Sequence, residues 1–160
     1  MSADNFWNNR ERAQKFSEES ARLRKQVETF QKTESQLADL QGMVELGRWS
    51  ESIPYLELAV IQDSLSGWAH HFLGTAIRHT GQLEDALTHQ QMASEQLPEC
   101  PWAPFEAGQL LQELGESKLA VLEMQEARRR SGETNEVIEA EWQKLKPVVV
   151  LEQLDQLILA

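Results

Sequence analysis

Small residues recur along the middle of this chain at a fixed interval of 34 positions. The residues that share the interval are Gly74, Gly81, Ala86 and Ala93 in one copy and Gly108, Gly115, Ala120 and Ala127 in the next, with Trp68 and Trp102 at their starts and Pro98 closing the first. A more degenerate copy precedes them and keeps Gly47 and Ala59. A period of roughly 20 to 50 residues is typical of stacked copies of one small unit.

Each copy predicts two antiparallel helices joined by a tight turn. Glycine permits the turn because it adopts a positive φ without strain, and small residues at fixed places let the two helices approach closely. One such pair leaves an apolar face exposed, which stacking on the next pair buries. The expected helices run over about 33–46 and 50–63, 67–80 and 84–97, and 101–114 and 118–131.

The middle copy resembles the tetratricopeptide repeat (TPR) family. The matching residues are Leu73–Gly74, Gly81, Ala86, Ala93 and Pro98. The resemblance implies an all-α, right-handed solenoid of about three repeats, at 33–66, 67–100 and 101–132. The chain departs from the family where an aromatic residue is expected in each second helix, because Leu56, Gln90 and Met124 stand there, and where Asp39–Leu40 replaces Leu–Gly.

The N-terminal stretch predicts one long helix over about 7–46, with residues 1–32 forming an arm. An apolar residue recurs every seventh position, which favours a coiled-coil-like seam: Phe16, Leu23, Phe30, Leu37 and Val44. Residues 5–47 also resemble the N-terminal helical domain of the bacterial release factor that reads UGA, through Phe6, Trp7, Ala13, Gln14, Lys15, Leu37, Asp39, Leu40, Met43, Glu45 and Leu46. The Gly-Gly-Gln loop and the codon-reading tripeptide of that family are absent, so the resemblance implies helix geometry and no catalytic residue.

Residues 133–160 predict a helix that caps the last repeat, followed by an apolar tail. The capping face is formed by Val137, Ile138, Trp142 and Leu145. Pro147 then interrupts the chain. The tail after it favours a short helix packed on the repeats, with docking on a second copy of the protein as the alternative.

Composition narrows the classes of function. A formal charge of −11 disfavours direct binding to nucleic acid or to a membrane surface. A single cysteine, Cys100, and four scattered histidines offer no metal-ligand set, and no nucleophile or phosphate-binding motif is present. We therefore expect no enzyme, no catalytic residue, no metal and no cofactor. No apolar leader opens the sequence, which favours a cytoplasmic location. Arg128, Arg129 and Arg130 are expected to interact with the dipole of their own helix.

The remaining hypothesis is binding of a protein or peptide. The TPR resemblance places the first helix of each repeat on a concave groove, and the residues it brings there are Trp68, His71, Thr75, Arg78, Trp102, Phe105, Gln109 and Gln112. Whether Trp68 and Trp102 face the groove or pack between repeats stays open. A clamp for a terminal carboxylate is disfavoured, since Arg78 is the single cation of the set. The expected function is an interaction scaffold. The alternatives are a translation-associated factor whose arm docks on the ribosome, a homodimer through arm or tail, and a fusion or design without an evolved partner.

Overall fold

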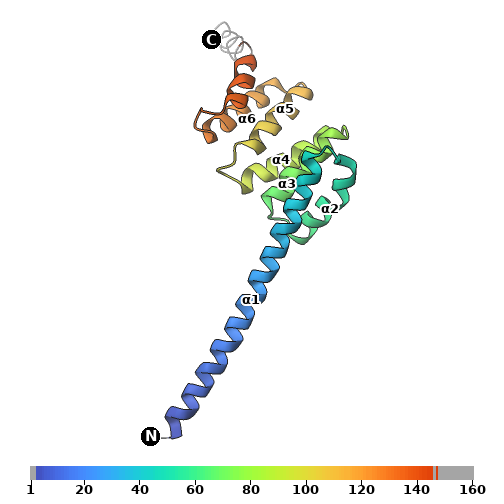
Figure 1. The fold of residues 1–160 in the computed structure, drawn as a ribbon. Coiled ribbons are helices and arrows are strands. Elements are labelled where there is room, and N and C mark those ends of the chain that lie inside the picture. The colour runs from blue at the N-terminus through green and yellow to red at the C-terminus, as the bar shows by residue number, and fades with distance from the viewer. Residues whose placement is uncertain (1–2, 146, 148–160) are drawn as a thin grey trace. The chain divides into compact units, whose positions relative to one another are not determined.

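The computed structural model describes residues 3–145 and residue 147, and within those residues it consists of helices joined by short links, with no strand. The helices are α1 (Ala3–Glu45), α2 (Trp49–Gln62), α3 (Gly67–His79), α4 (Leu83–Gln96), α5 (Trp102–Glu113) and α6 (Ser117–Arg130), followed by a helix through residues 136–145 (Figure 1). The all-α prediction is confirmed. No helix of the described residues is both long and apolar enough to span a bilayer. The predicted apolar tail lies outside the described residues.

The chain divides into two compact units, residues 1–39 and residues 40–160. The first unit is most of α1, which confirms the long N-terminal helix. Side chains over 10–28 and 31–36 are exposed, except that of Ser20, which is half-buried. Of the predicted apolar stripe, Phe16 and Leu23 are 74% and 50% exposed, Leu37 is half-buried and Val44 is buried. The predicted boundary after residue 32 falls inside α1 and stays a prediction.

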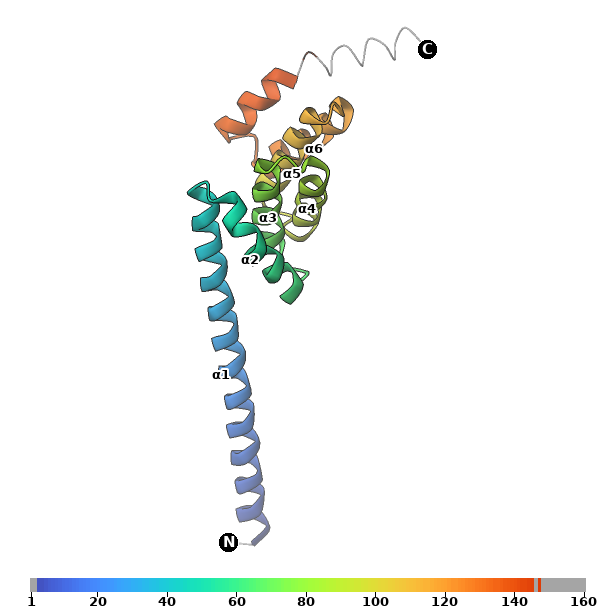
Figure 2. The ribbon, with the colours of Figure 1, turned by 90° about the vertical axis from the view of Figure 1, so that its right-hand side faces the viewer.

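The second unit is a series of helix pairs with glycine turns. α3 packs against α4 and α5 against α6, while α4 packs against α5 and joins the two pairs (Figure 2). The turns contain Gly47, Gly81 and Gly115, whose φ angles are +72°, +88° and +82°. This region of φ is strained for a residue with a Cβ, so the recurring glycine is required by the turn.

Small residues set the spacing within each pair. A Cβ on Gly74 would lie 3.0 Å from the carbonyl oxygen of Ala86, and one on Gly108 would lie 3.3 Å from that of Ala120. The four repeat alanines of α4 and α6 are fully buried: Ala86, Ala93, Ala120 and Ala127. The earlier copy is looser, because Ala59 is half-exposed and Leu40 occupies the place of Gly74 and Gly108.

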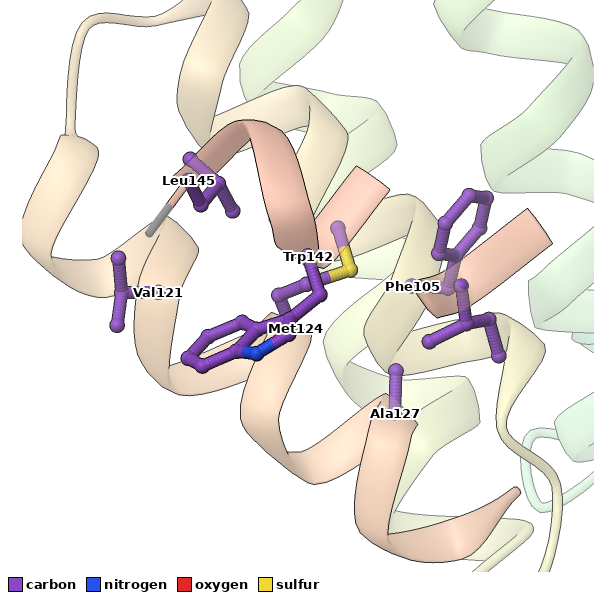
Figure 3. Packing of buried hydrophobic residues seen from close by; sticks show 7 residues of the cluster. Phe105, Val121, Met124, Ala127, Trp142 and Leu145 are labelled. Atoms are coloured by element: carbon purple, nitrogen blue, oxygen red, sulfur yellow. The ribbon is translucent and has the colours of Figure 1, made fainter. Parts of the chain in front are cut away.

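The helix through residues 136–145 caps the last repeat, as predicted. Its Ile138, Trp142 and Leu145 join Phe105, Val121, Met124 and Ala127 in one buried cluster against α6 (Figure 3). Val137 was also predicted to lie on this buried face, and that prediction is wrong because its side chain is 57% exposed. Asn135 accounts for the helix start, since its side-chain oxygen accepts bonds from the backbone amides of Val137 and Ile138 at 3.0 and 3.2 Å.

Candidate peptide-binding site

Two tryptophans lie at the N-terminal ends of the first helices of successive repeats. Trp68 is the second residue of α3 and Trp102 the first of α5. Trp68 is 41% exposed and Trp102 38%. Each indole rests against a ring of its own helix: Trp68 stacks on Phe72 with centroids 5.9 Å apart, and Trp102 meets Phe105 edge-on at 5.8 Å. Both indoles are therefore supported on one side and open to solvent on another.

A cavity of about 500 Å³ lies between these indoles. It is lined by Trp68, Trp102, the last residue of α4, Gln96, and the chain that links α4 to α5, namely Leu97, Pro98, Glu99, Cys100 and Pro101. Its lining surface is mostly apolar. Aromatic and apolar walls with few polar groups are typical of sites that bury one side chain of a partner. The cavity therefore forms at the junction of two repeats.

Gly67 allows this linking chain to approach α3. A Cβ at position 67 would lie 2.6 Å from Cγ of Leu97, much closer than such atoms approach in proteins. Any larger residue would displace Leu97 from the wall of the cavity. Gly67 has no glycine counterpart 34 residues on, because Pro101 stands there. The 34-residue pattern consequently gave no indication of this contact.

Arg130 holds the linking chain from the other side. Its Nη1 donates to the carbonyl oxygens of Ser94, Leu97 and Cys100 at 3.1, 3.0 and 3.2 Å, and its Nε donates to Glu126 at 2.7 Å. The Arg130 side chain is only 10% exposed. These bonds cap the C-terminal end of α4 and fix the chain that forms the cavity. Arg130 lies in the last turn of α6, as expected, and its bonds to the end of α4 and to the linking chain are an additional contact that the sequence analysis did not predict.

The two neighbouring arginines have partners of their own. Arg128 donates to Glu139 at 2.5 Å and Glu133 at 3.0 Å, and its guanidinium lies 5.8 Å from the centre of the Trp142 ring. Arg129 pairs with Glu126 at 2.7 Å. Hydrogen bonds from Arg129 and then Arg130 lower the pKa of Glu126 to about 2. These arginines therefore act through specific carboxylates, in addition to any effect of the helix dipole.

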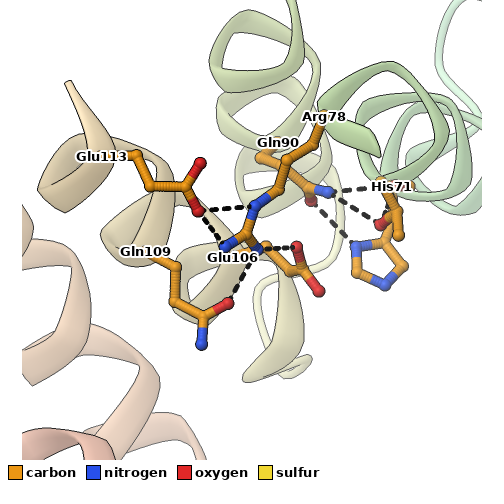
Figure 4. A network of polar contacts seen from close by, with 7 residues as sticks. His71, Arg78, Gln90, Glu106, Gln109 and Glu113 are labelled. Carbon is orange, nitrogen blue, oxygen red and sulfur yellow. Dashed lines mark hydrogen bonds and ion pairs between the residues drawn. The ribbon is translucent and has the colours of Figure 1, made fainter. Parts of the chain in front are cut away.

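Arg78 links α3 to α5 across the predicted groove (Figure 4). Its guanidinium donates to Glu106 at 2.9 Å, to Gln109 at 2.7 Å and to Glu113 through both Nε and Nη2. Burial opposes the charged form, but bonds and charge from Glu113 and Glu106 raise the pKa of Arg78 overall. The one cation of the predicted set is therefore already neutralised by two carboxylates.

His71 and Thr75 are held by a buried glutamine. Nδ1 of His71 lies 2.9 Å from Oε1 of Gln90, whose Nε2 donates to the His71 carbonyl and to the Thr75 hydroxyl, both at 3.1 Å. Because Oε1 is only an acceptor, Nδ1 of His71 carries the proton. Gln90 is completely buried. The residue that replaces the expected aromatic thus joins α4 to α3 by hydrogen bonds (Figure 4).

The prediction that Phe105 lines the groove is wrong. Phe105 is only 6% exposed and belongs to the buried cluster with Met124 and Trp142. Gln109 and Gln112 are half-buried, and Nε2 of Gln112 is enclosed with no hydrogen-bond partner. The structure therefore brings Trp68 and Trp102 together at one cavity, and it places Arg78 and Gln109 in a separate polar link.

The remaining histidines are engaged in pairs. Nδ1 of His70 lies 2.9 Å from Nδ1 of His89, and His79 stacks on Trp49 with centroids 3.9 Å apart. Nε2 of His70 faces the carbonyl oxygen of Ser64 at 3.2 Å, so it is the protonated nitrogen. His89 therefore donates from Nδ1 to His70. Within residues 3–145 and 147, no three ligand-type side chains are grouped as a metal site.

Comparison with known proteins connects the fold to one class. No protein-family model matches the sequence, and no curated protein does. Solved structures, however, match its fold. The Yersinia enterocolitica type III secretion chaperone SycD, in complex with a peptide of the translocator YopD, shares 16% identity over 75% of this chain and 93% of its own, with a TM-score of 0.66.

Two proteins described as TPR domains are equally similar. The first TPR of Spaghetti (RPAP3), bound to the HSP90 peptide SRMEEVD, shares 13% identity over 75% of this chain and 94% of its own, with a TM-score of 0.67. The Sgt2 TPR domain of Aspergillus fumigatus shares 13% over 76% and 82%, also with a TM-score of 0.67. The TPR-like fold is thereby confirmed, while the resemblance of residues 5–47 to a release factor stays a prediction.

Proposed function

We propose that this protein is a non-enzymatic interaction module that binds a partner peptide by burying one apolar side chain between Trp68 and Trp102. The observation that carries the proposal is the apolar cavity between two supported, half-open indoles. Tryptophans of this kind are the residues on which binding energy concentrates at interfaces. SycD and PcrH are described in complex with a translocator peptide and with the chaperone binding region of PopB. A peptide ligand suits the shared fold.

The charges around the site favour a basic peptide. Glu99 lies in the wall of the cavity, and Glu106 and Glu113 outnumber the Arg78 that they bind. Residues 47–160 carry 8 Lys and Arg against 18 Asp and Glu. An acidic peptide such as the SRMEEVD bound to RPAP3 would meet no available cation on the predicted face. Lysine or arginine beside the apolar anchor would instead lower the repulsion.

Selection from a random peptide library displayed on phage tests the proposal. Bound peptides are expected to share one large apolar residue and an excess of Lys and Arg over Asp and Glu. The affinity of a synthetic copy should fall roughly tenfold or more with Trp68→Ala or Trp102→Ala, measured by calorimetry, because each removes an anchor. Met92→Ala is the matched control, since Met92 on α4 is also 41% exposed and lies outside the cavity.

Two outcomes would overturn this function. One is a selection that yields acidic peptides or none. The other is an affinity that both tryptophan variants, folded as judged by circular dichroism, leave unchanged. If co-sedimentation with ribosomes is lost on deletion of residues 1–32, the alternative of a ribosome-docking factor replaces the present proposal.

A further inference from the structure

The long helix α1 carries apolar side chains that the described part of the chain leaves exposed. Phe16, Leu23 and Val27 are at least half exposed. Phe16 and Leu23 are seven residues apart, which is close to two helical turns, and Val27 follows about one turn later. The three side chains therefore lie on one side of the helix. An isolated helix in water gains little stability from its own hydrogen bonds and is normally stabilised by packing of such a stripe. The stripe therefore indicates a helical partner.

The distribution of charge along α1 indicates which kind of helix would pair with it. Residues 1–25 contain six Lys or Arg and four Asp or Glu, whereas residues 26–45 contain one Lys and four Asp or Glu. The helix is thus positive in its first half and negative in its second. Two copies side by side in the same direction would place like charges together. Two copies in opposite directions would place each positive half against a negative half.

The apolar positions have the same midpoint as the charge change. Val44, the last position of the seven-residue repeat, is already buried in the second unit. The other four positions, 16, 23, 30 and 37, are centred between residues 26 and 27. If two antiparallel copies cross there, position 16 of one lies beside position 37 of the other, and position 23 beside position 30. One register thus satisfies both the stripe and the charges. We propose that residues 1–39 pair with those of a second copy as an antiparallel homodimer.

Sedimentation equilibrium of the full chain tests whether the dimer exists. A monomer–dimer equilibrium is expected, and it should weaken as salt is raised because screening removes the charge term. Phe16→Ser and Leu23→Ser are each expected to raise the dissociation constant roughly tenfold, since each removes an apolar contact. Gln14→Ser and Ala21→Ser, toward the opposite side of α1, are the matched controls. A chain that stays monomeric at every concentration would overturn the proposal.

Spin labels distinguish the direction of pairing. In a Cys100→Ser background, a label at Ser17→Cys would be separated from its copy by about 28 Å along the helix axis in the antiparallel dimer, at 1.5 Å per residue. In a parallel dimer the two labels would lie at the same level. A label at Gln26→Cys is close to its copy in both arrangements and serves as the control. A short distance at position 17 would contradict the antiparallel arrangement.

Discussion

The two well-formed repeats use the same backbone and different chemistry to hold their helices together. In α3 and α4, His71 meets the buried Gln90 through hydrogen bonds. The corresponding positions 34 residues later hold Phe105 and Met124, which meet in an apolar cluster. Glycine and alanine set the helix spacing in both. This kind of repeat thus holds either a polar or an apolar pair at this place, and we expect that both members must change together.

The largest expected effect comes from mixing the two chemistries. Met124→Gln would bury an amide beside Phe105 with no partner, at a cost of about 3 kcal/mol in the free energy of unfolding. Urea unfolding at constant pH measures the loss. Adding Phe105→His supplies the hydrogen-bonding partner of the other repeat, so the double variant should recover at least about 1 kcal/mol relative to additivity. Strictly additive effects would show that the two positions are not coupled.

Position 130 gives the next largest effect. Arg130 of the last repeat and Gln96 of the middle one occupy corresponding places, and both reach back to carbonyls of the preceding loop. Arginine makes three bonds there, whereas Gln96 makes one of 3.4 Å to Ser64 and leaves its Oε1 buried without a partner. Arg130→Gln is therefore expected to cost about 2 kcal/mol. Gln96→Ala, the control, should cost clearly less in the same thermal or urea unfolding experiment.

The polar pair of the middle repeat should depend on both of its members. Gln90→Met alone leaves the Nδ1 proton of His71 without an acceptor and should cost about 1.5 kcal/mol. His71→Phe together with Gln90→Met reproduces the pair of the last repeat, so the combined change is expected to be nearly neutral. Urea unfolding of the single variant, the double variant and the wild type measures these differences. A double variant less stable than Gln90→Met would mean that the middle repeat requires the polar pair.

The smallest expected effect is a loss of stability at acid pH. Burial, followed by the charge of His70, lowers the pKa of His89 from 6.5, while Asp85 and Glu57 oppose the shift. The unfolded chain therefore binds the proton more tightly than the folded one, and stability falls as pH drops below 6.5. His89→Gln removes this titration, so its melting temperature should decline less with acidification than that of the wild type. If the melting temperatures of the variant and the wild type decline equally with acidification, His89 does not contribute to the loss of stability.

Much of the fold could be predicted from the sequence because turn glycines and close helix contacts impose residue types at fixed offsets. Gly74, Gly81 and Ala86 gave the helix pairs and their boundaries to within a residue. The candidate site was predictable only in part. Trp68 and Trp102 were found by their interval. Phe105 was assigned to the groove because it lies 34 residues after His71, but the interval does not show that Phe105 packs into the buried cluster with Met124 and Trp142.

Other members of the site had no signal in the pattern. Arg130 caps a helix of the previous repeat, and Leu97 packs on Gly67, so both contacts depend on how successive repeats stack. A period in the sequence fixes each unit and says little about side chains that reach across to the next. Such contacts follow from three-dimensional packing.

The single cysteine offers the most direct test of the central claim. Cys100 lies in the wall of the cavity between Trp68 and Trp102, so a peptide side chain seated there should shield its thiol. The measurement is the rate of Cys100 alkylation with and without a saturating amount of the selected peptide, with Trp68→Ala as control. The account predicts a rate that falls strongly with peptide in the wild type. An unchanged rate while calorimetry shows the peptide bound would contradict it.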